Sequence, residues 1–163
     1  MGVFLARGSG ASANVCDDRD GLHVTLAHRD TAPASLVAVI GDALLGARVA
    51  VHATHRVTAR WAAGAGTGAL VTALVVDGLT TIGGADGCAA RDLLPRVASG
   101  TPHVTLRVDG PTSNAAVGAA LRLLAAHVGG PLPAAPATFD VLDVTFDVEP
   151  VDAHMAGFVA TAE

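Results

Sequence analysis

The chain contains no lysine and no tyrosine, and only one tryptophan and four phenylalanines occur among its 163 residues. All ten basic residues are therefore arginines, and the formal net charge is −5. An acidic chain lacks the extended basic surface that long nucleic acids require. So few aromatic rings also exclude an extended base-stacking platform. A single phosphate can still be bound where a few arginines converge.

Cysteines and long apolar runs are scarce as well. The two cysteines, Cys16 and Cys88, are too few for a disulfide framework or a thiolate zinc cluster, so we expect two reduced thiols. No apolar run reaches the roughly 18 residues that a membrane span needs, and residues 3–6 are too short for a signal-peptide core. The sequence therefore predicts a cytoplasmic protein with no membrane partner.

One tetrapeptide occurs twice. His23-Val24-Thr25-Leu26 recurs as His103-Val104-Thr105-Leu106, at an offset of 80 residues (103 − 23 = 80), which is about half the chain. A helix start follows each copy, near Thr31 in the first half and at Thr112 or Ser113 in the second. We therefore predict one domain over 1–163 with two similar lobes, at about 21–78 and about 101–163.

Each half of the chain shows the pattern strand-helix-strand-strand. The expected strands are 21–28, 48–60, 68–76, 102–108, 138–148 and 154–162. The expected helices end near Gly46 and at Gly129-Gly130. Other expected features are loops at 8–21 and 129–136, a hairpin turn at 64–68, a turn at 83–87 and a short helix at 89–97. The predicted fold is α+β: a bilobal pseudo-twofold repeat, each lobe an antiparallel sheet with a helix on its outer face, around a central active-site cleft.

The repeated segment combines side chains that suit phosphodiester cleavage. Alternate residues of a strand share a face, so His23 and Thr25 should point one way, as should His103 and Thr105. The intervening valines and leucines should face the helices. A neutral histidine can take a proton from water, and a protonated one can give a proton to the leaving oxygen. Threonine hydroxyls can donate to the non-bridging oxygens. This chemistry requires no metal and no other cofactor.

Two His-x-Thr-hydrophobic segments half a chain apart resemble the two-histidine (2H) phosphoesterase superfamily, over the chain from Gly21 onward. The resemblance implies hydrolysis of a 2′,3′-cyclic phosphate on an RNA end or a cyclic nucleotide. It implies His23 and His103 as general acid and base, in either order, and Thr25 and Thr105 as phosphate ligands.

A finer resemblance rests on His-Val-Thr-Leu-Ala-His-Arg at 23–29 and on the Ser113-Asn114 helix start. These segments are most similar to the cyclic phosphodiesterase domain of fungal-type tRNA ligases, and Arg107 departs from the pattern of that branch. The branch implies a product that carries a 2′-phosphate.

Two other function classes compete with cyclic phosphate hydrolysis. The same site would serve RNA ligation or cleavage at 2′-5′ linkages. A non-catalytic nucleotide-binding module on the same fold would be expected to lose one of the two histidines. A single histidine in an apolar strand is usually structural, but its duplication with the same neighbours favours catalysis.

Further polar residues are candidates for substrate binding. Arg107 follows His103 and Thr105 at the same spacing of two, so a regular strand would place all three on the cleft face; alternatively, Arg107 solvates a strand end. Arg56 and His52 lie on the polar side of the segment 48–60. His52 and His55 should face opposite ways, so we do not expect them to chelate a metal. Four acidic residues should form a solvated face: Asp140, Asp143, Asp147 and Glu149.

Overall fold

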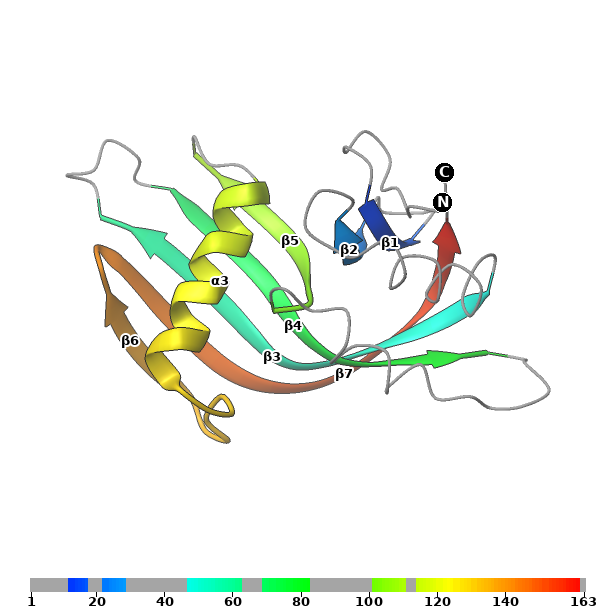
Figure 1. The fold of residues 1–163 in the computed structure, drawn as a ribbon. Helices are drawn as coiled ribbons and strands as arrows, with labels where there is room; N and C mark the ends of the chain where they lie inside the picture. Colours follow the sequence, from blue (N-terminus) through cyan, green and yellow to red (C-terminus); the bar gives the residue numbers. More distant parts are fainter. Residues whose placement is uncertain are drawn as a thin grey trace. The chain divides into compact units, whose positions relative to one another are not determined.

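The computed structural model describes residues 12–17, 22–28, 47–62, 69–82, 101–110 and 114–161. In chain order they form β1 (Ser12–Asp17), β2 (His23–His28), β3 (Arg48–Trp61), β4 (Leu70–Thr81), β5 (His103–Asp109), α3 (Asn114–Val128), β6 (Ala137–Val141) and β7 (Val144–Thr161) (Figure 1). The pairs β1–β2, β1–β7, β4–β5 and β6–β7 are antiparallel. These elements confirm the α+β class, whereas the pseudo-twofold repeat and its lobe boundaries stay predictions.

The chain divides into two compact units by its contacts. Among the described residues, the first unit contains β1, β2 and three strand segments: 48–52 of β3, 77–81 of β4 and 153–161 of β7. The second unit contains β5, α3, β6 and the remaining parts of the same three strands: 53–61, 70–76 and 144–152.

In the first unit, β1 lies between two antiparallel partners. Val15 pairs with Val24 of β2 on one side and with Ala160 of β7 on the other. The prediction of a loop over 8–21 is therefore wrong for Ser12–Asp17. Serine, asparagine and aspartate are poor strand formers, but hydrogen bonding to both neighbours overrides the local preference.

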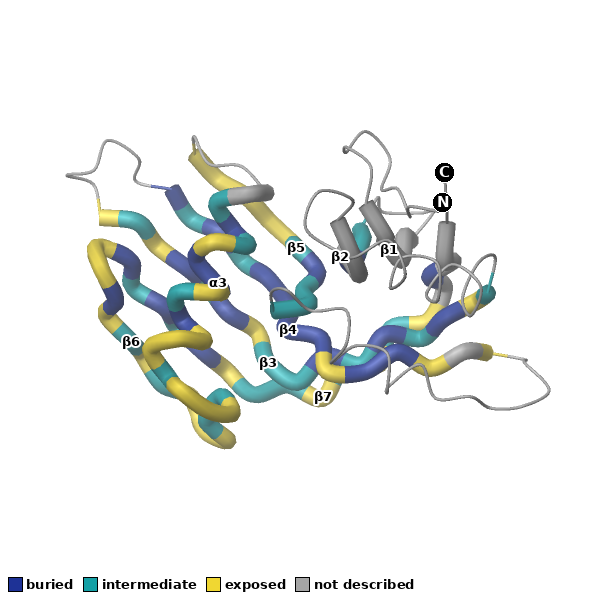
Figure 2. Tube along the Cα trace, in the orientation of Figure 1, coloured by how far each residue is buried: buried dark blue, intermediate teal, exposed yellow. Residues whose placement is uncertain are grey.

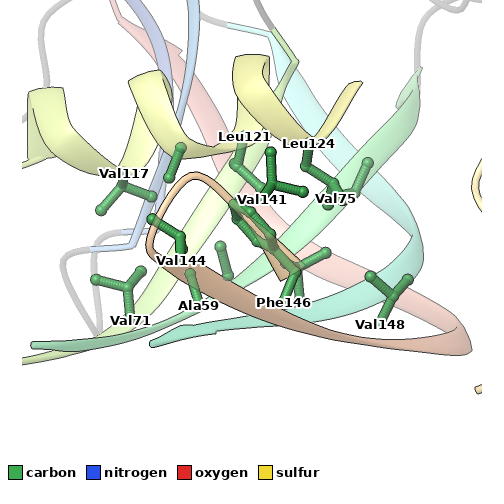
Figure 3. Close-up of a cluster of buried hydrophobic side chains, with 13 residues drawn as sticks. Ala59, Val71, Val75, Val117, Leu121, Leu124, Val141, Val144, Phe146 and Val148 are labelled. Carbon is green, nitrogen blue, oxygen red and sulfur yellow. The ribbon is translucent and has the colours of Figure 1, made fainter. Parts of the chain in front are cut away.

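In the second unit, α3 covers one face of the sheet. Val117, Leu121 and Leu124 recur at helical spacing and point from α3 towards Val141 and Phe146 (Figure 3). Alternate residues of the strands complete this cluster: Val57, Ala59, Val71, Ala73, Val75, Val144 and Val148. The same alternation of buried and more exposed residues runs along β3 (Figure 2). The valine spacing of each strand therefore decides which side faces the helix.

Helix α3 ends where the glycine pair predicted it. Gly129 adopts a φ of 64°, and its N–H donates to the carbonyl oxygen of Ala125 at 3.0 Å. This single hydrogen bond closes the last turn in the left-handed capping arrangement that favours glycine. A Cβ at Gly129 would meet no atom within 4 Å, so the backbone conformation rather than space requires glycine. Residues 129–136 are irregular, as predicted.

The segment 138–148 is a hairpin and not the single strand that we predicted. Val141 pairs with Val144 across a two-residue turn, in which Leu142 has a φ of 43° and Asp143 a φ of 64°. Positive φ at both positions matches the twist of a two-residue hairpin. Leucine gives no signal of such a turn in a sequence. β7 then continues to Thr161 and passes through Pro150, so no separate strand begins at His154.

Several predicted features lie outside the described residues. These are the helix between Thr31 and Gly46, the turns at 64–68 and 83–87, the helix at 89–97 and the helix cap at Thr112 or Ser113. Beside the first of these turns, the N–H of Trp61 donates to the carbonyl oxygen of Ala69 at 3.0 Å, which joins β3 to β4. No helix in the described part of the chain is long and apolar enough to cross a membrane.

Candidate active site

Both copies of the repeated tetrapeptide begin a strand at their histidine. β2 starts at His23 and β5 starts at His103. His23 pairs with Cys16 in β1, and His103 pairs with Val75 in β4. The two histidines are half-buried, and the valine that follows each is fully buried.

The two copies share a further feature, a bulge at the leucine. Along β2, Thr25 pairs with Asn14 and Ala27 with Ala13, so Leu26 has no partner in β1. Along β5, Thr105 pairs with Ala73 and Arg107 with Thr72, so Leu106 has no partner in β4. An extra residue of this kind bends the strand and re-aims its side chains, and such bulges are common beside active sites. The sequence predicted regular strands at both places, because a bulge at leucine has no signal in the residue pattern.

The register of β5 places His103 and Thr105 on the α3 side of the second unit. Directly paired residues of antiparallel strands share a face, and the partners Val75 and Ala73 both belong to the cluster beneath α3. Val104 pairs instead with Leu74, which lies outside that cluster. The prediction that Val104 faces the helix is therefore wrong. Both His103 and Thr105 are half-buried and lie outside that cluster.

Arg107 does not share the face of His103 and Thr105, which corrects the prediction made for a regular strand. The bulge at Leu106 brings Arg107 opposite Thr72, and Thr72 lies on the other side of β4 from Ala73. The Arg107 side chain is 70% exposed, and its Nε lies 2.6 Å from Oδ2 of Asp109. Leu106 itself is 41% exposed rather than directed into a core.

We expect Arg107→Ala to leave turnover of a cyclic phosphate close to that of the parent chain, because the arginine lies across the sheet from His103. Unfolding free energy should change by no more than about 0.5 kcal/mol, since exposed ion pairs contribute little. Steady-state kinetics and denaturant unfolding of this variant provide the measurement, with Thr105→Ala as the matched change on the proposed catalytic face. A large rise in KM for Arg107→Ala alone would show that the strand is regular at Leu106 in solution.

Arg56 lines a groove on the sheet face opposite α3. The groove has a volume of about 710 Å³, and its polar lining includes Thr58, Arg60, Thr72, Asp147 and Glu149. Arg56 pairs with Glu149, and Nη1 of Arg60 lies 2.9 Å from Oδ2 of Asp147. These ion pairs offset the charge of both arginines. Val57 and Ala59 face α3, so Arg56 does not share a face with His103.

The acidic residues lie at the surface, as predicted, and Asp140, Asp147 and Glu149 also make specific contacts. Asp147 accepts a hydrogen bond from Oγ1 of Thr138, and Asp140 accepts one from Oγ1 of Thr145, each at 3.0 Å. The two bonds join the same strands, β6 and β7, at directly paired positions. Such cross-strand pairs help to fix the register of the hairpin.

His52 and His55 contact different partners, as their position on opposite sides of β3 predicted. Nδ1 of His52 lies 2.6 Å from Oδ1 of Asp77, and the His52 ring stacks on that of His154 with centroids 4.4 Å apart. Nε2 of His55 lies 2.9 Å from the carbonyl oxygen of Pro133. His55 therefore fastens the loop 129–136 to β3. His52 belongs to a group of polar side chains on β3, β4 and β7 that no motif in the sequence predicted.

Comparison with known proteins gives one informative similarity. No family model and no curated protein matches the chain. The crystal structure of a fungal RNA kinase has a similar fold, with a TM-score of 0.56 and 14% sequence identity over 86% of this chain. The match spans 37% of the length of that protein. At this identity the similarity shows the fold, which this chain shares with a part of a larger enzyme.

Proposed function

We propose that this chain is a metal-independent phosphodiesterase that opens the 2′,3′-cyclic phosphate of an RNA end or a nucleotide. The observation that carries the proposal is the duplicated His-Val-Thr-Leu segment. Each copy begins a strand at its histidine and bulges at its leucine. Two segments alike in sequence and in local backbone are expected where both supply the same kind of side chain to a reaction.

In the proposed reaction, His23 and His103 act on opposite sides of the phosphorus. One histidine, in its neutral form, takes a proton from water as the water oxygen bonds to phosphorus. The other, protonated, gives a proton to the ribose oxygen as its bond to phosphorus breaks. The histidines exchange protonation states in each turnover, and solvent restores them. Thr25 and Thr105 would donate hydrogen bonds to the non-bridging oxygens, where negative charge increases in the transition state.

The choice of RNA as substrate is supported by the resemblance to the 2H phosphoesterases, which implies cyclic phosphates of RNA ends. The similar fold within a fungal RNA kinase agrees with this class of substrate. The retention of both histidines favours catalysis over a binding module. RNA ligation or cleavage at 2′-5′ linkages by the same residues is the second candidate, so it belongs in the same assay.

We expect the purified chain to convert 2′,3′-cyclic nucleotides and RNA ends to products with a 2′-phosphate and a free 3′-hydroxyl. The choice of leaving oxygen follows from the resemblance to fungal-type tRNA ligases. Chromatography of the products from a panel of cyclic mononucleotides, RNA ends and 2′-5′-linked dinucleotides provides the test. A 3′-phosphate product would exclude that branch, and no turnover of any cyclic phosphate would refute the proposal.

We expect activity to survive an excess of chelator. In the proposed reaction the histidines perform both proton transfers and the threonines stabilise the charge, so no step depends on an ion. The measurement compares initial rates before and after prolonged dialysis against EDTA. A loss of activity that a divalent ion restores would instead assign the chemistry to a metal-activated water.

A further inference from the structure

Four polar side chains, His52 among them, gather on the strands β3, β4 and β7. Nδ1 of His52 lies 2.6 Å from Oδ1 of Asp77, and its ring stacks on the ring of His154 at a centroid distance of 4.4 Å and an interplanar angle of 24°. Asp152 precedes His154 by two residues on β7, so their side chains share a face of that strand. Both are exposed.

Three of these residues each offer one ligand atom to a common position. One ligand atom from each of His52, Asp152 and His154 lies within 4.8 Å of the other two. Around a zinc ion with bonds of about 2.0–2.1 Å, tetrahedral ligand atoms stand about 3.4 Å apart. The three side chains therefore need to move inward by at most roughly 1.5 Å, a shift that exposed rotamers can supply.

We propose that His52, Asp152 and His154 bind a divalent transition-metal ion, with Zn²⁺ as the best match. Two imidazoles and one carboxylate suit ions of this class, whereas Mg²⁺ and Ca²⁺ prefer sites made of oxygen ligands. Three protein ligands leave the remaining coordination positions to water. The exposure of Asp152 and His154 gives the ion access from solvent.

Asp77 acts as the positioning residue of this site. Histidines that bind metals almost always donate their second ring N–H to a carboxylate or carbonyl, which fixes the tautomer and the ring orientation. Asp77 accepts from Nδ1 of His52, so the lone pair available to the ion is that of Nε2. A pair of surface histidines gathered by chance would not require this carboxylate.

The site is separate from the proposed reaction, which uses His23 and His103. The two proposals therefore fail independently. Zinc binding is expected to be the same in His103→Ala as in the parent chain, although that variant should lose catalysis. The ion would join β7 to β3, and its binding should raise the unfolding temperature, with a further, logarithmic rise as the zinc concentration increases above Kd.

Calorimetric titration of the full chain with zinc chloride, in a buffer that does not bind metals, tests the proposal. We expect one equivalent to bind in the parent chain and no binding in His52→Ala or His154→Ala. The near-isosteric Asp152→Asn should weaken binding, and Asp77→Asn should weaken it by about 10–100-fold. His127→Ala, which removes an exposed imidazole on α3, is the matched control and should bind like the parent.

Circular dichroism of each variant shows whether it is folded, and the asparagine variants keep the test decisive if an alanine variant does not fold. Zinc binding that is weakened by Asp152→Asn and Asp77→Asn but unchanged in His127→Ala supports the site. Binding that survives His154→Ala at full strength would overturn it, as would a parent chain that binds no zinc.

Discussion

His103→Ala is expected to reduce turnover of a 2′,3′-cyclic phosphate by about 10²–10⁴-fold, and His23→Ala by a similar factor. Each change removes one of the two groups that transfer protons in the proposed reaction. Single-turnover and steady-state kinetics of both variants provide the measurement. The two histidines are only half-buried, so we expect both variants to stay folded. Thermal unfolding of each variant checks this and so separates a loss of chemistry from a loss of structure.

The double variant sharpens this test. Groups that act together in one transition state lose most of the rate on the first removal, so His23→Ala with His103→Ala should be little slower than either single variant. His127→Ala removes an exposed imidazole from α3 and should leave the rate unchanged. Near-normal turnover in either single variant would rule out the two-histidine mechanism. Multiplicative losses in the double variant would show that the two residues do not act on one phosphate.

Phe146→Ala should cost about 3–5 kcal/mol of unfolding free energy, the largest stability effect that we expect in the second unit. Phe146 is fully buried, and Figure 3 shows its ring beneath Leu121 and Leu124 of α3. Alanine would leave a cavity, because the sheet and α3 are held apart by the surrounding side chains and cannot collapse into the space. Trp61, the single tryptophan of the chain, packs against the same cluster and so reports its unfolding by fluorescence in guanidinium.

Phe139 supplies the matched control. It packs against the same cluster from β6 but is only partly buried, so Phe139→Ala should cost clearly less. Phe146→Leu should recover part of the loss, because it keeps most of the apolar volume. Equal losses for the two alanine variants would contradict the packing beneath α3.

The strands that the sequence predicted correctly are those with regular valine patterns. Segment 48–60 alternates apolar and polar residues almost without a break, and β3 is found over Arg48–Trp61. The helix of the second half was equally clear, because Val117, Leu121 and Leu124 mark its inner face and Gly129 its end. In these elements the local preference and the tertiary environment agree, so the residue pattern is sufficient to predict the secondary structure.

The features that the sequence did not predict depend on partners far along the chain. β1 is built from residues that favour loops, and it is a strand because β2 and β7 flank it. Leu142 is not a typical turn residue, and the only trace of the turn is a change of phase in the apolar alternation, from Phe139 and Val141 to Val144 and Phe146. A one-residue shift reverses every following side chain, so the unseen bulge at Leu106 was enough to put Arg107 on the wrong face.

The two candidate sites differ in how far a sequence can reveal them. His23 and His103 were found because the tetrapeptide is repeated, which a single chain displays without any structure. His52 and His154 stand 102 positions apart (154 − 52 = 102) and share no motif. The His-x-x-His spacing of His52 and His55 resembles a metal-binding pair, but the two side chains contact different partners. His52 contacts His154 only because segments of β3 and β7 that are remote in the sequence lie together in the fold.

The pairing of β1 with the last strand also limits when the first unit can finish folding during synthesis. Asn14 pairs with Thr161, 147 positions later (161 − 14 = 147). Closing so long a loop carries a higher entropic cost than closing the two-residue turn of the β6–β7 hairpin. On a ribosome, every described segment of the second unit up to Asp152 is made before residues 158–161 emerge. Until then one edge of β1 has no partner from β7, and its hydrogen-bonding groups are open to a neighbouring chain.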